Sequence, residues 1–331
     1  MKAQIIEFFG DPTVFKIKDV PKPEVQPGHI LIKVKASSVN PIDTKVRIGA
    51  VPAVTPALPA VLHGDVAGIV TEIGEGVVDF NLGDEVFGCA GGFKGTGGAL
   101  AEFMLADAQF LAHKPHNLTM EEAAALPLVS ITAWEALFNR GQLKPGQKIL
   151  IHAAAGGVGH IAIQLAKWAG AEVYTTASTE EKLHIAKQLG ADGVINYRKE
   201  TVQEYVQKFT NGKGFDLVFD TVGGKNLNRS FEAAAVNGTV LAIAARSTHD
   251  LTPLHSKGLS FHVTFMLLKI LNKDQRREHG EILKKIAQIA EEGKLRPLID
   301  QNIFTFDEVA KAHEYLESQK AIGKIVLKNN W

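Results

Sequence analysis

The sequence has one cysteine, no excess of charge of either sign and no long apolar run. One thiol, Cys89, cannot form an internal disulfide or supply a four-cysteine zinc lobe, which favours a reducing compartment. The formal net charge of +0 excludes a whole-molecule field that would attract nucleic acid or an anionic membrane. No apolar stretch approaches the roughly 20 residues of a membrane span. The N-terminal segment MKAQIIEFFGDPTVF lacks the apolar core of a secretory signal. We therefore expect a cytoplasmic protein that has neither a nucleic-acid nor a membrane partner.

What the sequence does have is the composition of a soluble globular protein. Its 45% apolar and 22% charged residues separate it from disordered and fibrous chains. A length of 331 residues exceeds what one core usually holds, so two domains are expected. The first part is rich in glycine, proline and β-branched residues, with strands predicted at Ile30–Ala36, Val66–Ile73 and Glu85–Gly88. We expect this part to form an irregular, mostly β domain.

Beyond Pro115 the pattern changes to alternating helices and strands. Thr119, with Glu122 three residues later, predicts a capping box at the start of an apolar helix. From Lys148 onward, five strands are predicted: KILIHAA, AEVYTTA, GVINY, FDLVFDTV and GTVLAIAA. The helices between them are expected to begin near Val158, Glu180, Val202 and Asn226. This alternation indicates a parallel sheet with crossover helices.

The C-terminal tail returns to a helix, HGEILKKIAQIAEEGKL, and later forms a strand, GKIVLK. A piece of this kind can complete the first domain, which would then be discontinuous. We predict one domain from residues 1–124 with 267–331 and a second from residues 125–266. The fold class expected is α/β, a mostly β domain joined to a doubly wound parallel sheet.

Gly156, Gly157, Val158 and Gly159 form a glycine turn directly after the first strand of the predicted parallel sheet. The sequence GVGHIA fits the G-x-G-x-x-A fingerprint, which places a dinucleotide pyrophosphate at the N-terminus of the following helix. Glycine lets the backbone turn sharply and approach the phosphates, and the small Ala162 allows close packing of helix on strand. A tight turn that holds no ligand is the alternative. The strand before the turn and the helix after it favour the dinucleotide site.

The second strand of this sheet ends in TTAS at residues 175–178, without a carboxylate at its tip. NAD sites carry Asp or Glu about 20 residues after the first glycines, to bind the ribose 2′-hydroxyl. Hydroxyls and cations instead suit a 2′-phosphate. Ser178 is followed by Lys182, and Tyr197 with Arg198 closes the next strand. We therefore expect NADPH as the cofactor, with Ser178, Lys182 and Tyr197 among its ligands. An ordinary surface lysine is the alternative for Lys182.

The motifs SSVNPIDTKVRIG, HGDVAGIV, NLGDEVFG and AAAGGVG follow one another along the chain. With these motifs the sequence resembles the medium-chain dehydrogenase/reductase superfamily, and within it the zinc-free quinone oxidoreductase and enone reductase branch. The resemblance implies a GroES-like catalytic domain, made of the N-terminal stretch and the C-terminal tail, with a Rossmann domain inserted. It also implies an active site in the cleft, hydride transfer from NADPH and a homodimer.

The resemblance also bears on zinc. Zinc-dependent relatives place a cysteine where this sequence has Asn40, and a His-Glu pair where it has Gly64-Asp65. His63 is one residue out of register with that pair, and the cysteines of a structural zinc site are missing. A catalytic zinc needs three protein ligands at tetrahedral spacing, which cannot be assembled from these residues. We therefore predict no metal.

The loop from Asn40 to Lys45, NPIDTK, is the candidate substrate site. In relatives with an asparagine here, the amide lies beside the nicotinamide ribose and the substrate; relatives with the N-P-x-D-x-K form place the lysine near the nicotinamide. Without zinc, another donor must stabilise the oxyanion that forms during hydride transfer. We predict Lys45 as this donor and Asn40 as a positioning and cofactor-binding group. Asp43 is either a catalytic residue or a carboxylate that caps local N–H groups, and Lys45 is otherwise an exposed loop lysine.

Three further residues are predicted to contact the cofactor. Thr132, by the resemblance, matches a position that approaches the nicotinamide. Val222 follows the strand FDLVFDT and Ala244 ends the strand GTVLAIA, so both lie at the carboxyl ends of parallel strands, where a dinucleotide binds. Ordinary strand ends are the alternative for both.

The function predicted is NADPH-dependent reduction of quinones or α,β-unsaturated carbonyls by hydride transfer, without zinc. Two alternatives stay open at this point. One is a zinc-independent alcohol or aldehyde dehydrogenase/reductase, and the other is an NADPH-binding redox sensor with little turnover.

Overall fold

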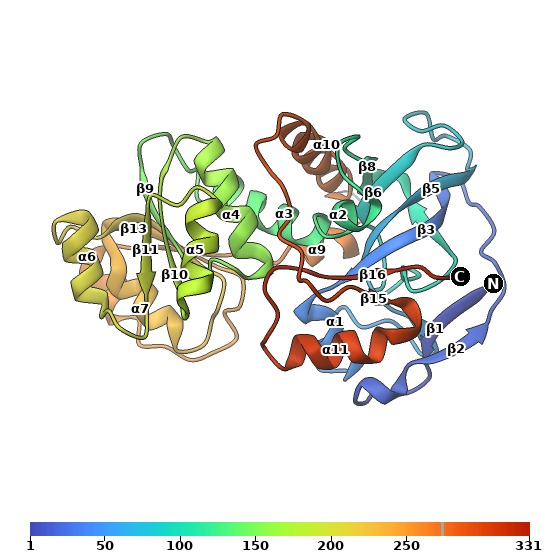
Figure 1. Ribbon diagram of the computed structural model, residues 1–331, viewed down its shortest axis with the longest axis horizontal. Helices are drawn as coiled ribbons and strands as arrows, with labels where there is room; N and C mark the ends of the chain where they lie inside the picture. Colours follow the sequence, from blue (N-terminus) through green and yellow to red (C-terminus); the bar gives the residue numbers. More distant parts are fainter. Residues whose placement is uncertain (273–274) are drawn as a thin grey trace. The chain divides into compact units, whose positions relative to one another are not determined.

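The computed structural model describes residues 1–272 and 275–331. The chain divides into one unit of residues 1–131 with 267–331 and a second unit of residues 132–266 (Figure 1). Both ends of the sequence meet in the first unit, because β16 (Ile325–Lys328) pairs antiparallel with β3 (His29–Val39). The boundary expected after residue 124 falls before α3 (Pro127–Trp134), whereas the two units divide within that helix.

The first unit is built on two β-sheets. The larger has the strand order β15-β16-β3-β5-β6-β8, with β7 also paired to β3, and the smaller has the order β2-β1-β4. The remaining strands of the two sheets are β15 (Phe304–Thr305), β5 (Asp65–Ile73), β6 (Glu85–Cys89), β8 (Leu111–His113), β7 (Phe103–Asp107), β2 (Lys16–Asp19), β1 (Lys2–Ile6) and β4 (Ala60–Val61). The strands predicted at Ile30–Ala36, Val66–Ile73 and Glu85–Gly88 are present as β3, β5 and β6.

Short helices connect and cover these sheets. They are α1 (Pro41–Arg47), α2 (Met120–Ala124), α9 (Leu267–Leu271), α10 (Arg277–Glu291) and α11 (Val309–Glu317), with single 3₁₀ turns at Pro12–Val14, Ala108–Phe110 and Phe306–Glu308. The predicted capping box is present, since the Thr119 hydroxyl accepts from the Glu122 N–H and the Glu122 carboxylate accepts from the Thr119 N–H. Among the helices of the described residues, none is long and apolar enough to cross a membrane.

The apolar helix expected after Thr119 is interrupted. The helix α2 ends at Ala124, and α3 starts at Pro127, whose ring nitrogen has no hydrogen to donate to a continuing helix. A π-helical turn, Glu135–Arg140, then follows α3 directly. The sequence pattern showed the helical periodicity but not this break.

The second unit contains a sheet of six parallel strands in the order β11-β10-β9-β12-β13-β14. These strands are β9 (Lys148–Ile151), β10 (Glu172–Ala177), β11 (Gly193–Asn196), β12 (Phe215–Asp220), β13 (Ala234–Ala242) and β14 (Ser260–Val263). The sequence predicted the first five. It missed β14, because SFHV is short, is half polar and has no helix-length segment of clear periodicity before it.

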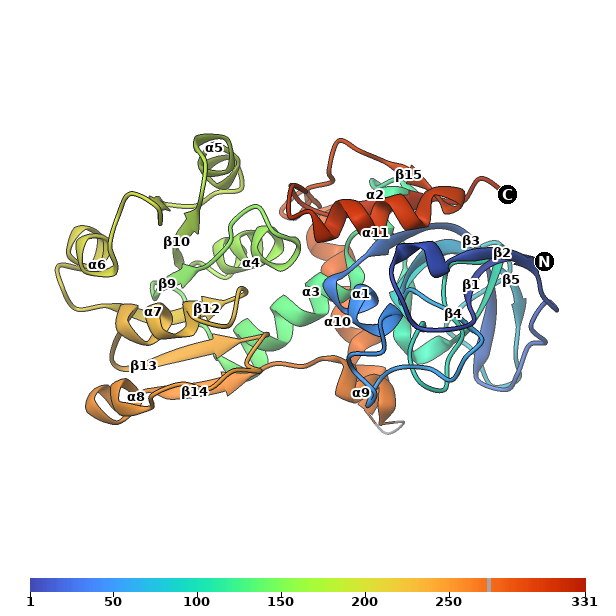
Figure 2. The same ribbon diagram turned by 90° about the horizontal axis from the view of Figure 1, so that it is seen from below.

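Five helices cover the two faces of this sheet: α4 (Gly157–Trp168), α5 (Glu180–Gln188), α6 (Val202–Thr210), α7 (Asn226–Ala233) and α8 (Thr252–Lys257). Figures 1 and 2 show α4 and α5 on one face and α6 and α7 on the other. An apolar core that includes Leu150, Val218 and Phe231 fills the space under α6 and α7. The chain runs outward from β9 through β10 to β11 and returns to β12 beside β9, so the strand order reverses between β9 and β12. Ligands bind at the carboxyl ends of the strands at such a reversal.

Candidate functional site

The turn between β9 and α4 has the properties of an anion site. Gly156 is the N-cap of α4, in an extended conformation and without a side-chain cap, and the helix runs for 12 residues from Gly157. The N–H groups of the first turn have no partner within the helix, and the helix dipole is positive at this end. An uncapped helix start after a parallel strand is therefore open to a phosphate group.

Glycine is required inside this turn. A Cβ on Gly159 would lie 2.2 Å from the carbonyl oxygen of Ala153, and no real side chain tolerates that approach. A Cβ on Gly156 would lie 3.2 Å from the same oxygen, a contact that needs a small adjustment. Ala153 itself has a positive φ of 59°. The glycines thus keep the backbone close and bare where the helix begins, as the fingerprint predicts.

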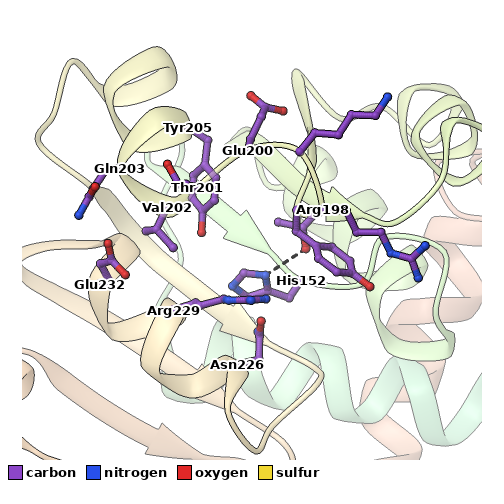
Figure 3. Close-up of a pocket in the computed structure, with 13 residues that line it drawn as sticks. His152, Arg198, Glu200, Thr201, Val202, Gln203, Tyr205, Asn226, Arg229 and Glu232 are labelled. Carbon is purple, nitrogen blue, oxygen red and sulfur yellow. Dashed lines mark hydrogen bonds between the residues drawn. The ribbon is translucent and has the colours of Figure 1, made fainter.

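A pocket of about 440 Å³ opens at the carboxyl ends of the same strands, between α6 and α7 (Figure 3). Its walls include His152 after β9, Thr176 in β10, Tyr197 and Arg198 after β11, and Arg229 on α7. Residues from four consecutive βα units therefore meet in one concave site at the reversal of strand order, where a small-molecule ligand is expected.

His152 offers an unused nitrogen to this pocket. Its side chain is buried, and its Nδ1 lies 3.0 Å from the Thr176 hydroxyl, the contact drawn in Figure 3. Among the described residues, its Nε2 has no hydrogen-bond partner. Burial lowers the pKa of His152 to about 4, so the ring is neutral at neutral pH. A buried, neutral and unpartnered ring nitrogen suits a polar ligand atom, because leaving it unpaired is costly.

The pocket also carries cations. Arg198 and Arg229 are exposed, and within the described part of the chain neither guanidinium forms a hydrogen bond or ion pair. Lys199, by contrast, pairs with Glu180 at 2.9 Å. Two uncommitted guanidinium groups in the wall of one pocket favour an anionic ligand such as a nucleotide phosphate.

Asp220 holds the loop that carries Val222. This carboxylate is fully buried at the end of β12, and one oxygen accepts from the N–H groups of Val222 and Gly223, at 2.8 and 2.7 Å. The other accepts from Asn226 and Ser230. The loop after β12 is thereby fixed against the start of α7, and its Val222 side chain is 52% exposed.

Most predicted cofactor residues lie at this edge of the second unit. Gly156 to Gly159 form the turn, and Tyr197 lines the pocket. Val222 and Ala244 are neighbours, since a Cβ on Gly223 would lie 2.2 Å from the Ala244 oxygen. Ser178 is half-buried at the end of β10.

Two further predicted cofactor residues lie in helices. Lys182 is half-buried in the first turn of α5, where its backbone N–H donates to the hydroxyl of the N-cap residue Thr179. Thr132 is buried in α3.

The sequence pattern passed over several groups at this edge. His152 is the first residue after the apolar KILI strand, and a polar side chain at that point was the available signal. Arg229 lies in the second turn of α7, and no local pattern connects it with β9. The hydroxyl of Thr175 is not free for a ligand, because it donates to the Ile151 carbonyl at 2.6 Å.

Asn40 lies in the first unit, in a buried polar cluster with Asp65 and Lys324. The Asn40 amide nitrogen donates to Asp65 Oδ2 at 2.8 Å, and its amide oxygen accepts from the Lys324 ammonium. The ammonium also lies 3.6 Å from Asp65 Oδ2. Burial lowers the pKa of Lys324, while the neighbouring carboxylates oppose that shift. Both ends of the Asn40 amide are thus held inside the unit.

Asp43 caps the first turn of α1. Its Oδ2 accepts from the Asn40 N–H at 2.7 Å, which is the local capping that the sequence allowed. The side chain is buried, and burial, together with the charge of Asp65, raises the pKa of Asp43 to about 7. Lys45, two residues further along α1, is exposed to solvent.

His63 forms a buried pair with His313. Its Nε2 lies 2.8 Å from Nε2 of His313 on α11, and its Nδ1 lies 3.4 Å from the Ser37 hydroxyl. Burial lowers the pKa of His63 to about 3 and that of His313 well below its ordinary value. Both rings are therefore neutral, and each uses one nitrogen for the other, while Nδ1 of His313 lies 3.1 Å from the Arg47 guanidinium.

The carboxylate of Asp65 is also committed. Its Oδ1 accepts from the Leu128 N–H, and its Oδ2 accepts from Ser38 and Asn40. Within residues 1–272 and 275–331, no group of three or more His, Cys, Asp or Glu side chains is placed to hold a metal ion.

Two domain families match the sequence. The family described as alcohol dehydrogenase GroES-like domain matches residues 26–116, and the family described as zinc-binding dehydrogenase matches residues 189–327. The first lies in the unit of two β-sheets. The second begins in the parallel-sheet unit and extends into the C-terminal tail.

Curated relatives cover the whole chain. The 2-methylene-furan-3-one reductase of Solanum lycopersicum is 37% identical over 335 residues, 99% of this chain and 79% of that protein. The quinone oxidoreductase of Rattus norvegicus is 32% identical over 329 residues, 99% of this chain and 97% of that protein. Among solved structures, the Escherichia coli quinone oxidoreductase complexed with NADPH matches with a TM-score of 0.88 and 29% identity, over 99% of this chain and 100% of that chain.

The two domain matches, the full-length relatives and the shared fold agree with the glycine turn and the pocket at the reversal of strand order. The chain belongs to the medium-chain dehydrogenase/reductase superfamily, in the branch of quinone oxidoreductases and enone reductases, and it is an oxidoreductase.

Proposed function

We propose that this protein transfers a hydride from NADPH to a quinone or an α,β-unsaturated carbonyl compound, without zinc. The observation that supports this most directly is the carboxyl edge of the second unit. There, the uncapped start of α4 follows the end of β9. The pocket at the ends of the neighbouring strands contains the buried, unpartnered Nε2 of His152 and two uncommitted arginines. NADPH, when bound, supplies the hydride.

The residues of the second unit fit the parts of a phosphorylated dinucleotide. The turn from Gly156 to Gly159 would hold the pyrophosphate, because its N–H groups and the helix dipole favour an anion. Ser178 and Lys182 would bind the 2′-phosphate, and Tyr197 would border the adenosine end in the pocket. Thr132, Val222 and Ala244 are proposed as contacts of the nicotinamide half.

The proposal that zinc is not used rests on the donors of the first unit. Asn40 stands where zinc-dependent relatives have a cysteine, and its amide is bonded to Asp65 and Lys324. His63 uses its nitrogens for His313 and Ser37. A metal at this point would have to displace four internal hydrogen bonds and tolerate the ammonium of Lys324.

In the first unit, we propose Lys45 as the donor to the acceptor's carbonyl oxygen. Its ammonium is exposed and on a rigid helical turn, so it can meet the negative charge that develops as the hydride adds to the conjugated system. Asn40 would act by positioning, through the cluster that fixes the start of α1. Asp43 is proposed to serve the same site, by holding that helix start.

The cofactor preference tests the proposal first. NADPH is expected to bind at least ten times more tightly than NADH. The rise in melting temperature and the quenching of tryptophan fluorescence measure both affinities. The variant Lys182→Ala should lose roughly tenfold in NADPH affinity and little in NADH affinity, since about 1.4 kcal/mol corresponds to a factor of ten. Lys213→Ala, an exposed lysine before β12 at the opposite edge of the sheet, is the matched control. Equal affinities for both cofactors would refute the assignment.

Turnover tests the acceptor class. We expect NADPH oxidation with 1,4-benzoquinone or a simple enone, with a rate that a chelator leaves unchanged. A preference for alcohols or aldehydes would favour the dehydrogenase alternative. Tight NADPH binding without turnover on any acceptor would favour a redox sensor.

A homodimer in a reducing, cytoplasmic compartment completes the proposal. The strand β14 lies at the edge of the parallel sheet, with exposed Ser260 and Val263, and an open edge strand can pair with a second chain. Cys89 is buried, and burial raises the pKa of its thiol well above the ordinary value, so a dimer through this residue is not expected. Light scattering on the purified protein is expected to give twice the mass of one chain.

A further inference from the structure

A serine, a histidine and an asparagine form a connected set after β13. The Ser247 hydroxyl lies 2.6 Å from Nε2 of His249, and Nδ1 of His249 lies 2.8 Å from Oδ1 of Asn228. Asn228 belongs to α7, so the set joins the loop after β13 to the helix that follows β12. These three residues belong to none of the sequence motifs and to no part of the proposed cofactor site.

The partners define where the imidazole carries its proton. The amide oxygen of Asn228 accepts only, so Nδ1 of His249 must be the N–H that donates to it. In the neutral ring Nε2 is then a bare acceptor, and the Ser247 hydroxyl donates to it. When His249 is protonated, Nε2–H donates to Ser247, and the serine hydroxyl hydrogen is free to donate onward.

The ring is held in this orientation. His249 is half-buried, and the Phe231 ring meets it edge to face, with centroids 6.2 Å apart and planes at 88°. Next along the chain, the Asp250 carboxylate accepts from the N–H and the hydroxyl of Thr252, which fixes the loop to the start of α8. Ser247 itself is exposed. The set thus presents a hydroxyl to solvent in front of an oriented base.

This set lies at the carboxyl edge of the parallel sheet. Ser247 follows Ala244 by three residues, and the Ala244 oxygen packs against Gly223 in the loop after β12. Ala244 and Val222, in these two loops, are the residues proposed to contact the nicotinamide half. The hydroxyl of Ser247 is therefore on the segment that carries one of the proposed nicotinamide contacts.

We propose that Ser247 is a catalytic proton donor of the reductase and that His249 supplies and positions its proton. This inference rests on the proposed function. Hydride from NADPH forms a C–H bond at the acceptor's β-carbon, and the electrons of the C=C bond move to the carbonyl oxygen as an enolate. Ser247 gives its hydroxyl proton to the enolate and takes one from Nε2 of protonated His249, which solvent then protonates again. NADPH, one proton and the enone become NADP⁺ and the saturated carbonyl compound.

Asn228 suits this role better than a carboxylate would. A neutral amide orients the imidazole through Nδ1, but it does not stabilise the imidazolium as an aspartate does. The proton on Nε2 is therefore more easily passed on. A positioned acid of this kind typically contributes 10²–10⁴-fold to a rate.

Kinetics of matched variants test the relay. His249→Asn keeps an amide that can donate to Asn228 but removes Nε2, and Ser247→Ala removes the hydroxyl. Both are expected to lower kcat on an enone about 10²-fold or more, with the Kd for NADPH within twofold of wild type. Added imidazole should restore part of the rate of His249→Ala. His255→Asn, an exposed histidine on α8, is the control and should match wild type.

The tautomer of His249 can be measured in the protein without cofactor, so it tests the relay independently of turnover. Long-range ¹H–¹⁵N spectra of neutral His249 are expected to show a protonated Nδ1 and an unprotonated Nε2, and Asn228→Ala should abolish that preference. An Nε2–H tautomer overturns the relay, as does a kcat for His249→Asn within threefold of wild type. A wild-type protein that binds NADPH but reduces no quinone or enone overturns the proposed function, and the relay with it.

Discussion

The cluster around Asn40 in the first unit and the pocket around His152 in the second differ in how their buried polar groups are paired. In the first unit, Asn40, Asp65 and Lys324 satisfy one another, and His63 is paired with His313. At the carboxyl edge of the second unit, Nε2 of buried His152 has no partner among the described residues, and the start of α4 has no side-chain cap. The first arrangement stabilises a fold, whereas the second leaves bonds for a ligand to complete.

The difference identifies which polar groups are available for chemistry. A buried group whose hydrogen bonds are complete can take part in a reaction only by giving up a partner. A buried group with an unused donor or acceptor gains a bond when a ligand arrives. By this criterion, the second unit is the place to test cofactor binding, and the cluster around Asn40 is the place to test stability.

The largest effect is expected from the buried ammonium of Lys324. In Lys324→Met, the fully buried Asp65 loses its charge partner, which should lower the free energy of unfolding by about 3–5 kcal/mol. Urea denaturation measures this. Lys328→Met, at the end of the strand that Lys324 precedes, is exposed and 3.4 Å from Glu121, and it should change this free energy by less than about 1 kcal/mol. Adding Asp65→Asn to Lys324→Met should recover part of the loss, because no charge is then left unpaired.

Acid should destabilise the protein through its buried histidines. The folded-state pKa values of His63 and His152, about 3 and about 4, lie below the ordinary 6.5. The unfolded chain therefore binds more protons between these values, and the stability present above pH 6.5 is lost as the pH falls toward 4. Each such group changes the free energy of unfolding by about 1.4 kcal/mol per pH unit within this window. Urea midpoints at pH 7 and pH 5 measure the change, and equal midpoints would contradict it.

Alanine substitutions in the glycine turn should lower the affinity for the cofactor, and most where the added Cβ lies closest to the backbone. Gly159→Ala places a methyl group 2.2 Å from the Ala153 oxygen, so the backbone must move, and the NADPH Kd should rise about tenfold or more. In Gly156→Ala the distance is 3.2 Å, and a smaller rise is expected. Fluorescence titration gives both values. The reverse order would show that the turn does not act through this close approach.

The smallest effect is expected at Asp43. Because its folded-state pKa of about 7 lies above the ordinary 3.8, its stabilising contribution is complete below pH 3.8 and is lost as the pH rises through 7. Asp43→Asn keeps an oxygen for the Asn40 N–H, so stability near neutral pH should change by only about 1 kcal/mol. The variant should gain stability relative to wild type as the pH rises from about 4 to about 7. A constant difference across that range would show that Asp43 does not titrate there.

Local patterns predicted the elements with fair success. The helix starts at Val202 and Asn226 and the five strands from β9 to β13 lie where periodicity and caps placed them. The strand β14 was not predicted because it is short and its local signal is weak. The division of the apolar helix was not predicted because it depends on the single residue Pro127. Among site residues, the glycine turn was predictable because its backbone leaves no room for a side chain.

What the sequence determined by itself is therefore whatever depends on neighbours along the chain: the alternation of strands and helices, the turn from Gly156 to Gly159, and the absence of a carboxylate at the tip of β10. The tertiary structure decided which distant groups meet. It brought Lys324 to Asn40 and His313 to His63, and it left Nε2 of His152 facing a pocket. The physical reason is that backbone preference acts over a few residues, whereas the pairing of a buried polar group depends on every segment that packs around it.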